Sequence, residues 1–179
     1  MSGAEGPLLV LVGPPASGKT TVGRAVAAAL GVDFRDTDRD VELETGSSVP
    51  DLFVEHGEAH FRDLERRAVA RGLAEHDGVL ALGGGAVTAP ETRALLVAHG
   101  SRGGVVVWLD VDLPSAARRV GLSRDRPLLA VNPRAMLRSM LEQRAPLYAE
   151  VSTHTVATSD RSTDDVVADV LALVSGATR

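Results

Sequence analysis

The chain has 179 residues, of which 44% are hydrophobic, 24% charged and 3% aromatic, with a formal net charge of −5 and no cysteine. The length predicts one globular domain over residues 1–179, and the lack of cysteine excludes disulfides, thiolate catalysis and cysteine-based zinc sites and fits a cytoplasmic compartment. An acidic chain poor in aromatics is not expected to bind nucleic acid. Residues 1–6 lack the basic start of a signal peptide, so secretion is not expected. No apolar run approaches ~20 residues, so a membrane span is not expected.

The first expected element is a short apolar strand over residues 8–12, followed by the segment GPPASGKT at 13–20. This segment matches the pattern G-x-x-x-x-G-K-[ST], in which backbone N–H groups surround phosphates, the lysine reaches the β- and γ-phosphates and the hydroxyl binds Mg²⁺. Lys19 is the only lysine among the 19 lysine and arginine residues, which marks a place where a compact ammonium is needed. The helix expected over 19–30 begins behind the loop, and a helix N-terminus favours anions. The sequence therefore predicts a nucleoside triphosphate site, formed by Gly13, Pro14, Pro15, Ala16, Ser17, Gly18, Lys19, Thr20 and Thr21.

Ala16 occupies the fourth position of this motif, where many small-molecule kinases have glycine. If the loop requires a positive φ there, alanine costs on the order of 1 kcal/mol relative to glycine. The motif admits any residue at this position, so the prediction of a phosphate site is kept.

A second strand is expected over 32–35, with Asp36 and Asp38 at its carboxyl end. Ligands of open α/β sheets bind outside the carboxyl ends of strands, so both carboxylates are expected near the phosphate loop. One could hold Mg²⁺ through water, while the other accepts a hydrogen bond or a proton from a substrate hydroxyl. The alternative is that the pair only caps the helix that follows.

The longest helix is expected over 58–74, with Arg62 at the edge of its apolar face. A strand over 79–82 follows, and three consecutive glycines at 83–85 come directly after it. Such a run indicates close approach of the backbone to a ligand, with free N–H groups for an anion or a hydroxyl. The alternatives are a surface pair of Arg62 with Glu58 and a plain turn at the glycines.

The segment 121–133 has no clear hydrophobic period and carries Arg126. We expect it to form a mobile lid, because such loops close over phosphate chemistry and exclude water; an ordinary surface connection is the alternative. A helix is expected to begin at Pro133 and to end near 145, because Pro146 follows. Arg144 would then lie at its last turn, exposed unless a ligand holds it.

Five runs of strand type recur along the chain, at 8–12, 32–35, 79–82, 105–109 and 154–157. Helical patterns separate them, and a last helix is expected over 164–174. This alternation predicts an α/β fold, with a parallel sheet flanked by helices on both faces.

Taken together, these segments resemble shikimate kinase over nearly the whole chain. Besides the phosphate loop, the resemblance rests on DTD at 36–38, DLF at 51–53, GEAHFR at 57–62, LGGGAV at 82–87, RPLL at 126–129 and RAPLY at 144–148. The phosphate loop is shared by many enzymes, but the ordered set is specific. The resemblance implies an adenylate-kinase-like P-loop kinase fold with strand order 2-3-1-4-5. It also implies MgATP-dependent phosphorylation of the shikimate 3-hydroxyl, a step of aromatic amino acid biosynthesis.

The resemblance further implies which residues act. Asp38, Lys19 and Arg126 would be catalytic, and Thr20 and Asp36 would hold Mg²⁺. Shikimate would be bound within a segment of about 36–66 and by later residues, through Asp38, Arg62, Gly83, Gly84, Gly85 and Arg144. Beyond the phosphate loop, ATP would be bound by Arg119, Arg126 and Arg161. A monomer that takes ATP and shikimate is expected.

Two other functions remain open from the sequence. A kinase of another small hydroxy acid, such as gluconate, would use the same loop and lid but leaves Arg62, Arg144 and the glycines at 83–85 less well explained. A nucleotide-dependent switch without turnover would need neither the second carboxylate nor the arginine set. A coupled assay of ATP consumption with and without shikimate separates the enzyme from the switch.

Overall fold

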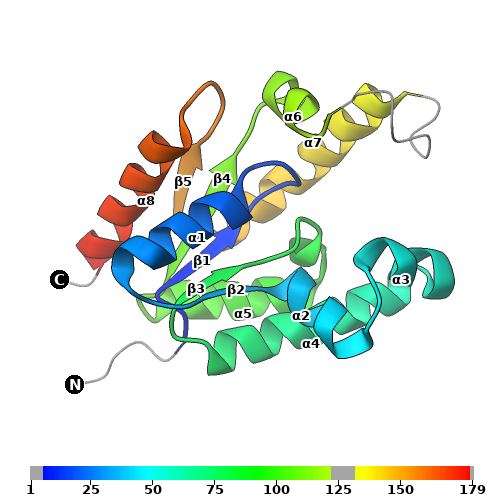
Figure 1. Cartoon of the computed structure of the whole chain (residues 1–179), viewed down its shortest axis with the longest axis horizontal. Coiled ribbons are helices and arrows are strands. Elements are labelled where there is room, and N and C mark those ends of the chain that lie inside the picture. The colour runs from blue at the N-terminus through cyan, green and yellow to red at the C-terminus, as the bar shows by residue number, and fades with distance from the viewer. Residues whose placement is uncertain (1–5, 122–131, 178–179) are drawn as a thin grey trace.

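The structure, a computed structural model that describes residues 6–121 and 132–177, is centred on a sheet of five parallel strands (Figure 1). The strands are β1 (Leu9–Val12), β2 (Phe34–Asp36), β3 (Val79–Ala81), β4 (Val105–Asp110) and β5 (His154–Ala157). Their order is β2-β3-β1-β4-β5, which confirms the predicted 2-3-1-4-5 arrangement. Val10 of β1 pairs with Leu80 of β3 on one side and with Val106 of β4 on the other. The loop that follows β1 therefore starts from the centre of the sheet.

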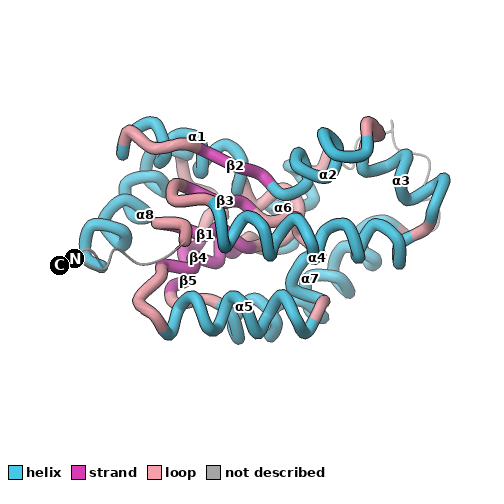
Figure 2. The backbone as a smooth tube through the Cα atoms, turned by 90° about the horizontal axis from the view of Figure 1, so that it is seen from below, coloured by secondary structure: helices cyan, strands magenta, loops and turns pink. Residues whose placement is uncertain are grey.

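Helices cover both faces of this sheet. They are α1 (Lys19–Leu30), α2 (Thr37–Thr45), α3 (Val49–His56), α4 (Glu58–Glu75), the 3₁₀ turn η1 (Ala86–Thr88), α5 (Pro90–Ser101), α6 (Leu113–Arg119), α7 (Pro133–Val151) and α8 (Thr163–Ala177). The cores place α1 and α8 on one face and α4, α5 and α7 on the other. Figure 2 shows the strands one after another in the order of the sheet, from β2 to β5. None of the helices in the described ranges is long and apolar enough to cross a membrane.

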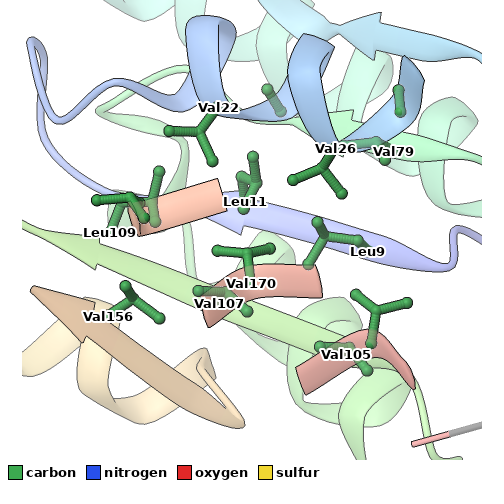
Figure 3. Packing of buried hydrophobic residues seen from close by; sticks show 14 residues of the cluster. Leu9, Leu11, Val22, Val26, Val79, Val105, Val107, Leu109, Val156 and Val170 are labelled. Carbon is green, nitrogen blue, oxygen red and sulfur yellow. The ribbon is translucent and has the colours of Figure 1, made fainter. Parts of the chain in front are cut away.

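β1 is buried on both faces, since each of its four residues is at most 1% exposed. Leu9 and Leu11 pack with Val26 of α1 and Val170 of α8 (Figure 3), whereas the alternate residues of the strand face the other core. A strand covered on both sides must be apolar throughout, which explains the unbroken run of Leu and Val. Each such side chain contributes ~1.5–3 kcal/mol when fully buried. The carboxyl end of β1 is thereby a rigid base for the loop above it.

The chain leaves the sheet between β2 and β3 and forms α2, α3 and the start of α4, which project to one side in Figure 1. These helices share a small core of their own, made of Val41, Leu52, Phe61, Leu64 and Ala68. This core packs the start of α4 against α2 and α3, and it thereby positions the start of α4 relative to the ends of β2 and β3.

Most predicted boundaries lie within a few residues of those observed, and two of the differences have a clear physical reason. β2 begins at Phe34 rather than at residue 32, because the N–H of Val32 is bonded to the carbonyl of Ala27 at the end of α1. α7 does not end near 145 but continues through Pro146 to Val151. Proline removes one helical N–H, yet the turn after it is held by burial of Tyr148 and Val151 against the sheet.

Candidate active site

The phosphate loop joins β1 to α1 at the middle of the sheet edge. Ala16 has a φ of 64°, so the loop does require a left-handed residue at this position, at a cost on the order of 1 kcal/mol. The Lys19 ammonium donates hydrogen bonds to the carbonyls of Gly13 at 2.8 Å and Pro14 at 2.9 Å. Burial lowers the pKa of Lys19 to about 8, against the opposing charges of Asp38 and Asp36. The Lys19 ammonium is thus held between carbonyl groups of the phosphate loop.

Asp36 connects the end of β2 to the phosphate loop. Its Oδ2 accepts a hydrogen bond from the Thr20 hydroxyl at 3.2 Å, and its Oδ1 accepts one from the N–H of Asp38 at 2.9 Å. The second bond makes Asp36 the N-cap of α2, so the capping interpretation is correct for this residue. The bond between Thr20 and Asp36 brings together a hydroxyl and a carboxylate oxygen beside the loop, and oxygen atoms are the ligands that Mg²⁺ prefers.

Asp38 lies in the first turn of α2 and faces the same cavity as the phosphate loop. Its Oδ1 is buried and accepts no hydrogen bond from any described residue. Burial raises the pKa of Asp38 to about 6, and the nearby charges of Asp36 and Glu65 add to the rise. A buried carboxylate oxygen without a donor is costly unless a ligand supplies one, so this oxygen marks a place for a hydroxyl.

The glycines after β3 are needed because site residues lie where their side chains would be. A Cβ on Gly83 would lie 2.5 Å from Oδ1 of Asp38 and 2.7 Å from Oε2 of Glu65. A Cβ on Gly85 would collide with the guanidinium of Arg62. The run is therefore a close approach of backbone to charged groups and not a loose turn.

Arg62 projects from the first turns of α4 and is held by two carboxylates. Its guanidinium lies 2.8 Å from Oε1 of Glu65 and 3.3 Å from Oε1 of Glu58. The rings of Phe53 and Phe61 lie 5.8 and 5.4 Å from its central carbon. The surface pair with Glu58 is present, but it is only part of an arrangement that fixes Arg62 beside the glycines.

Arg144 reaches the same region from α7. Its guanidinium lies close enough to the hydroxyl of Tyr148 to oppose the effect of burial on the pKa of that hydroxyl, and the hydroxyl donates to the carbonyl of Gly84 at 2.6 Å. Gly84 in turn lies against the phosphate loop, because a Cβ there would be 2.8 Å from Cδ of Pro15. Two arginines from distant elements, Arg62 and Arg144, thus flank one short stretch of backbone.

Arg119 and Arg161 lie on the other side of the phosphate loop. Arg119 donates to the carbonyl of Ala16 at 3.3 Å and to the Thr158 carbonyl at 2.6 Å. Arg161 donates to the carbonyl of Ala157 at 3.1 Å and pairs with Asp169 at 2.8 Å. Neither arginine is near the glycine run, so they belong to a second part of the site.

Two cavities meet at the phosphate loop. One, of about 340 Å³, is lined by loop residues together with Asp36, Asp38, Gly83 and Gly84. The other, of about 270 Å³, is lined by the start of α1 and by Arg119, Thr158 and Arg161. The two cavities share Gly18 and Thr21, so ligands in both would meet at the loop. A larger cavity of about 400 Å³ between β4, α6 and α7 touches the loop at Pro14 but is not lined by Lys19 or Asp38.

Comparison with known proteins identifies the family. The family model for shikimate kinase matches residues 15–175, and a shikimate kinase of Salinispora arenicola is 58% identical over 94% of this chain and 98% of its own length. This chain belongs to the shikimate kinase family. Within that family, the structure of the Acinetobacter baumannii enzyme in complex with shikimate matches with a TM-score of 0.85 at 37% identity, covering 94% of this chain and 92% of that one.

The comparisons also bear on the two alternatives. A gluconokinase from Sinorhizobium meliloti matches with a TM-score of 0.58 at 18% identity, over 98% of this chain and 94% of that one, which shows a shared fold alone. The shikimate kinase relatives are enzymes, so membership of their family favours turnover over a passive switch.

Two residues of this shikimate kinase site were missed from the sequence. Glu65 is 2% exposed and pairs with Arg62, and its Oε2 has no partner among the described residues. Burial raises the pKa of Glu65, against the opposing effect of Arg62. In the sequence, the only indication for Glu65 was its position three residues after Arg62. The second missed residue is Tyr148, for which the sequence offered no indication beyond the RAPLY motif. Arg126 and most of the segment predicted as a lid lie outside the described residues.

Proposed function

We propose that the chain transfers the γ-phosphoryl group of ATP to the 3-hydroxyl of shikimate and releases shikimate 3-phosphate and ADP. The observation that carries the proposal is the pair of cavities that meet at the phosphate loop, one with an unpartnered buried carboxylate oxygen on Asp38. Shikimate bears one carboxylate and three hydroxyls, and the acceptor cavity and its surroundings offer groups for both.

On the acceptor side, we assign Arg62 and Arg144 to the substrate carboxylate. Guanidinium groups bind carboxylates through two parallel hydrogen bonds, which fix orientation as well as supply charge. The N–H of Gly83 donates to the Thr37 hydroxyl at 3.2 Å, so we assign the N–H groups of Gly84 and Gly85 to the substrate. Asp38 accepts a hydrogen bond from the reacting hydroxyl. Glu65 and Glu58 hold Arg62 in place while shikimate is absent.

On the nucleotide side, we assign the β- and γ-phosphates to the loop backbone and Lys19, and the adenosine to the cavity that Arg119 and Arg161 line. The N-terminus of α1 adds its dipole to the same phosphates. The role of Arg126 at the phosphates is assigned from the family resemblance alone.

Thr20 and Asp36 fit a Mg²⁺ ion, because their oxygens lie 3.2 Å apart at the mouth of the phosphate loop. Such an ion, when bound, would neutralise charge on the β- and γ-phosphates. Asp36 is already fixed as the N-cap of α2, so its remaining lone pairs are held in one orientation.

The reaction follows from these placements. The 3-hydroxyl oxygen of shikimate attacks the γ-phosphorus, the bond from that phosphorus to the bridging oxygen of ADP breaks, and the hydroxyl proton passes to Asp38. A pKa of about 6 leaves Asp38 ionised at neutral pH and able to accept that proton. Lys19 balances charge on the transferring group, since such reactions depend mainly on positioning and electrostatics. All assigned groups belong to one chain, so a monomer suffices.

The proposal is tested by coupling ADP release to NADH oxidation with the full chain, MgATP and either shikimate, gluconate or no acceptor. We expect ADP release that depends on shikimate, with shikimate 3-phosphate as the product and only background release with gluconate. ADP release at the same rate with and without shikimate would refute the proposal.

A further inference from the structure

Tyr148 connects two groups of the acceptor site without lining its cavity. It is 1% exposed, and its ring packs into the core between the sheet and α7, 5.7 Å from the ring of Trp108. Its hydroxyl oxygen lies 2.6 Å from the carbonyl oxygen of Gly84, and the Arg144 guanidinium lies close to the same hydroxyl. An apolar ring in the core thus carries one polar group to the edge of the site.

The direction of the bond to Gly84 decides what the hydroxyl can offer Arg144. Its single proton goes to the carbonyl of Gly84, so only the lone pairs of its oxygen are open to the nearby Arg144 guanidinium, which can only donate. Burial raises the pKa of Tyr148 to about 12, so the hydroxyl keeps this proton at neutral pH. The donor of this hydroxyl is therefore used by Gly84, and its acceptor lone pairs are left for Arg144.

Fixing the carbonyl of Gly84 also fixes the next peptide group. The peptide between Gly84 and Gly85 is planar and trans, so the N–H of Gly85 points opposite to the carbonyl that Tyr148 holds. The N–H group of Gly85 donates to no other described residue. It stays available to a ligand, in an orientation that depends on the tyrosine hydroxyl.

We propose that Tyr148 is a positioning residue for shikimate, which orients the Arg144 guanidinium and the Gly84–Gly85 peptide together. This inference deepens the proposed function and rests on it. Tyr148 acts through these two groups and touches neither substrate. Because they would bind parts of shikimate that do not react, the loss of Tyr148 should weaken shikimate binding and leave the chemical step nearly intact.

Tyr148→Phe tests the role, because it removes the hydroxyl and keeps the ring. We expect KM for shikimate to rise about five- to tenfold, as for one lost hydrogen bond, while kcat and KM for ATP stay within about twofold. Trp108→Phe is the matched control, since it alters the neighbouring, partly buried ring and leaves the Tyr148 hydroxyl in place. It should leave KM for shikimate within about twofold.

A double-mutant cycle distinguishes positioning from general loosening. In an Arg144→Ala background, Tyr148→Phe should raise KM for shikimate by a smaller factor than in the wild type, because one of its two targets is already gone. An unchanged KM in Tyr148→Phe, or the same factor in both backgrounds, would overturn the positioning role while wild-type turnover of shikimate still supports the proposed function. Absence of wild-type turnover with shikimate would refute the proposed function and the positioning role with it.

Discussion

The nucleotide side and the acceptor side of this site are built differently. The nucleotide side is formed mainly by one continuous loop, in which backbone groups and Lys19 surround the phosphate position. The acceptor side brings together Asp38, Arg62, Arg144 and the glycine run, which come from separate elements of the chain. Local sequence is thus sufficient for the first, whereas the second exists only once the sheet and α4 and α7 have packed.

The two sides also differ in how they hold charge while empty. Lys19 donates to carbonyls of its own loop, so its charge is paired with dipoles that a phosphate displaces. Arg62 is paired with full charges on Glu58 and Glu65, while the Asp38 oxygen opposite has no partner among the described residues. On the acceptor side the charge of Arg62 is therefore paired, whereas the Asp38 oxygen still needs a hydrogen-bond donor.

The largest effect is expected from Asp38→Asn, which keeps the shape of the side chain but removes a proton acceptor. We expect kcat to fall by ~10²–10⁴-fold, with KM for ATP little changed. Steady-state kinetics with each substrate varied in turn measure both. Turnover within a few-fold of the wild type would mean that Asp38 is structural and that the acceptor lies elsewhere.

Lys19→Arg tests the opposite side. A guanidinium is wider than an ammonium and cannot enter the loop between the carbonyls of Gly13 and Pro14, so we expect kcat to fall by ~10²–10³-fold despite the conserved charge. Lys19→Ala should be as poor. Near-normal kcat for the arginine variant, with folding verified by circular dichroism, would contradict the need for a compact charge.

Arg62→Ala should affect binding of only one substrate. Loss of a charged hydrogen bond to a non-reacting carboxylate should raise KM for shikimate by ~10–100-fold and leave kcat and KM for ATP nearly unchanged. Arg66→Ala on the same helix, whose guanidinium pairs with Asp63 away from the cavity, is the matched control and should change neither KM. A rise confined to KM for ATP would mean that Arg62 acts on the nucleotide side and not on the acceptor side.

The pH profile should report Asp38. Because burial raises its pKa to about 6, the carboxylate is ionised above that pH and becomes protonated below it. We expect kcat/KM for shikimate to be level near pH 7 and to fall about tenfold by pH 5. Asp38→Asn should lose this acidic limb. A limb that persists in the variant would assign it to another group.

The smallest effect is expected from Ala16→Gly. Relief of the left-handed strain should stabilise the fold by ~1 kcal/mol, while the added freedom of the unfolded chain removes a similar amount. The free energy of unfolding in urea should change by less than about 1 kcal/mol, and kcat should stay within about twofold. A larger loss of stability would show that the alanine methyl group makes contacts that offset its backbone strain.

These contrasts explain what could be predicted from sequence. The phosphate loop, the carboxylates after β2 and the glycines after β3 were found because each follows a strand, and parallel strands all end at one sheet edge. The pair of Arg62 with Glu58 was considered, but the continuation of α7 through Pro146, the pairing of Arg62 with Glu65 and the proximity of Tyr148 to Arg144 were not predicted. Tyr148 acquires its role from a contact with Gly84, which lies 64 residues away in the sequence. Glu65 pairs with Arg62 on the same helix, but its burial follows from packing of that helix.

The central claim is that the acceptor side recognises the carboxylate of the same molecule that carries the reacting hydroxyl. It is tested most directly by comparing kcat/KM for shikimate with that for its carboxamide analogue, in the wild type and in Arg62→Ala. We predict that the wild type favours shikimate by ~10–100-fold and that Arg62→Ala loses most of this preference. Equal use of both acceptors by the wild type, or an undiminished preference in the variant, would contradict the account.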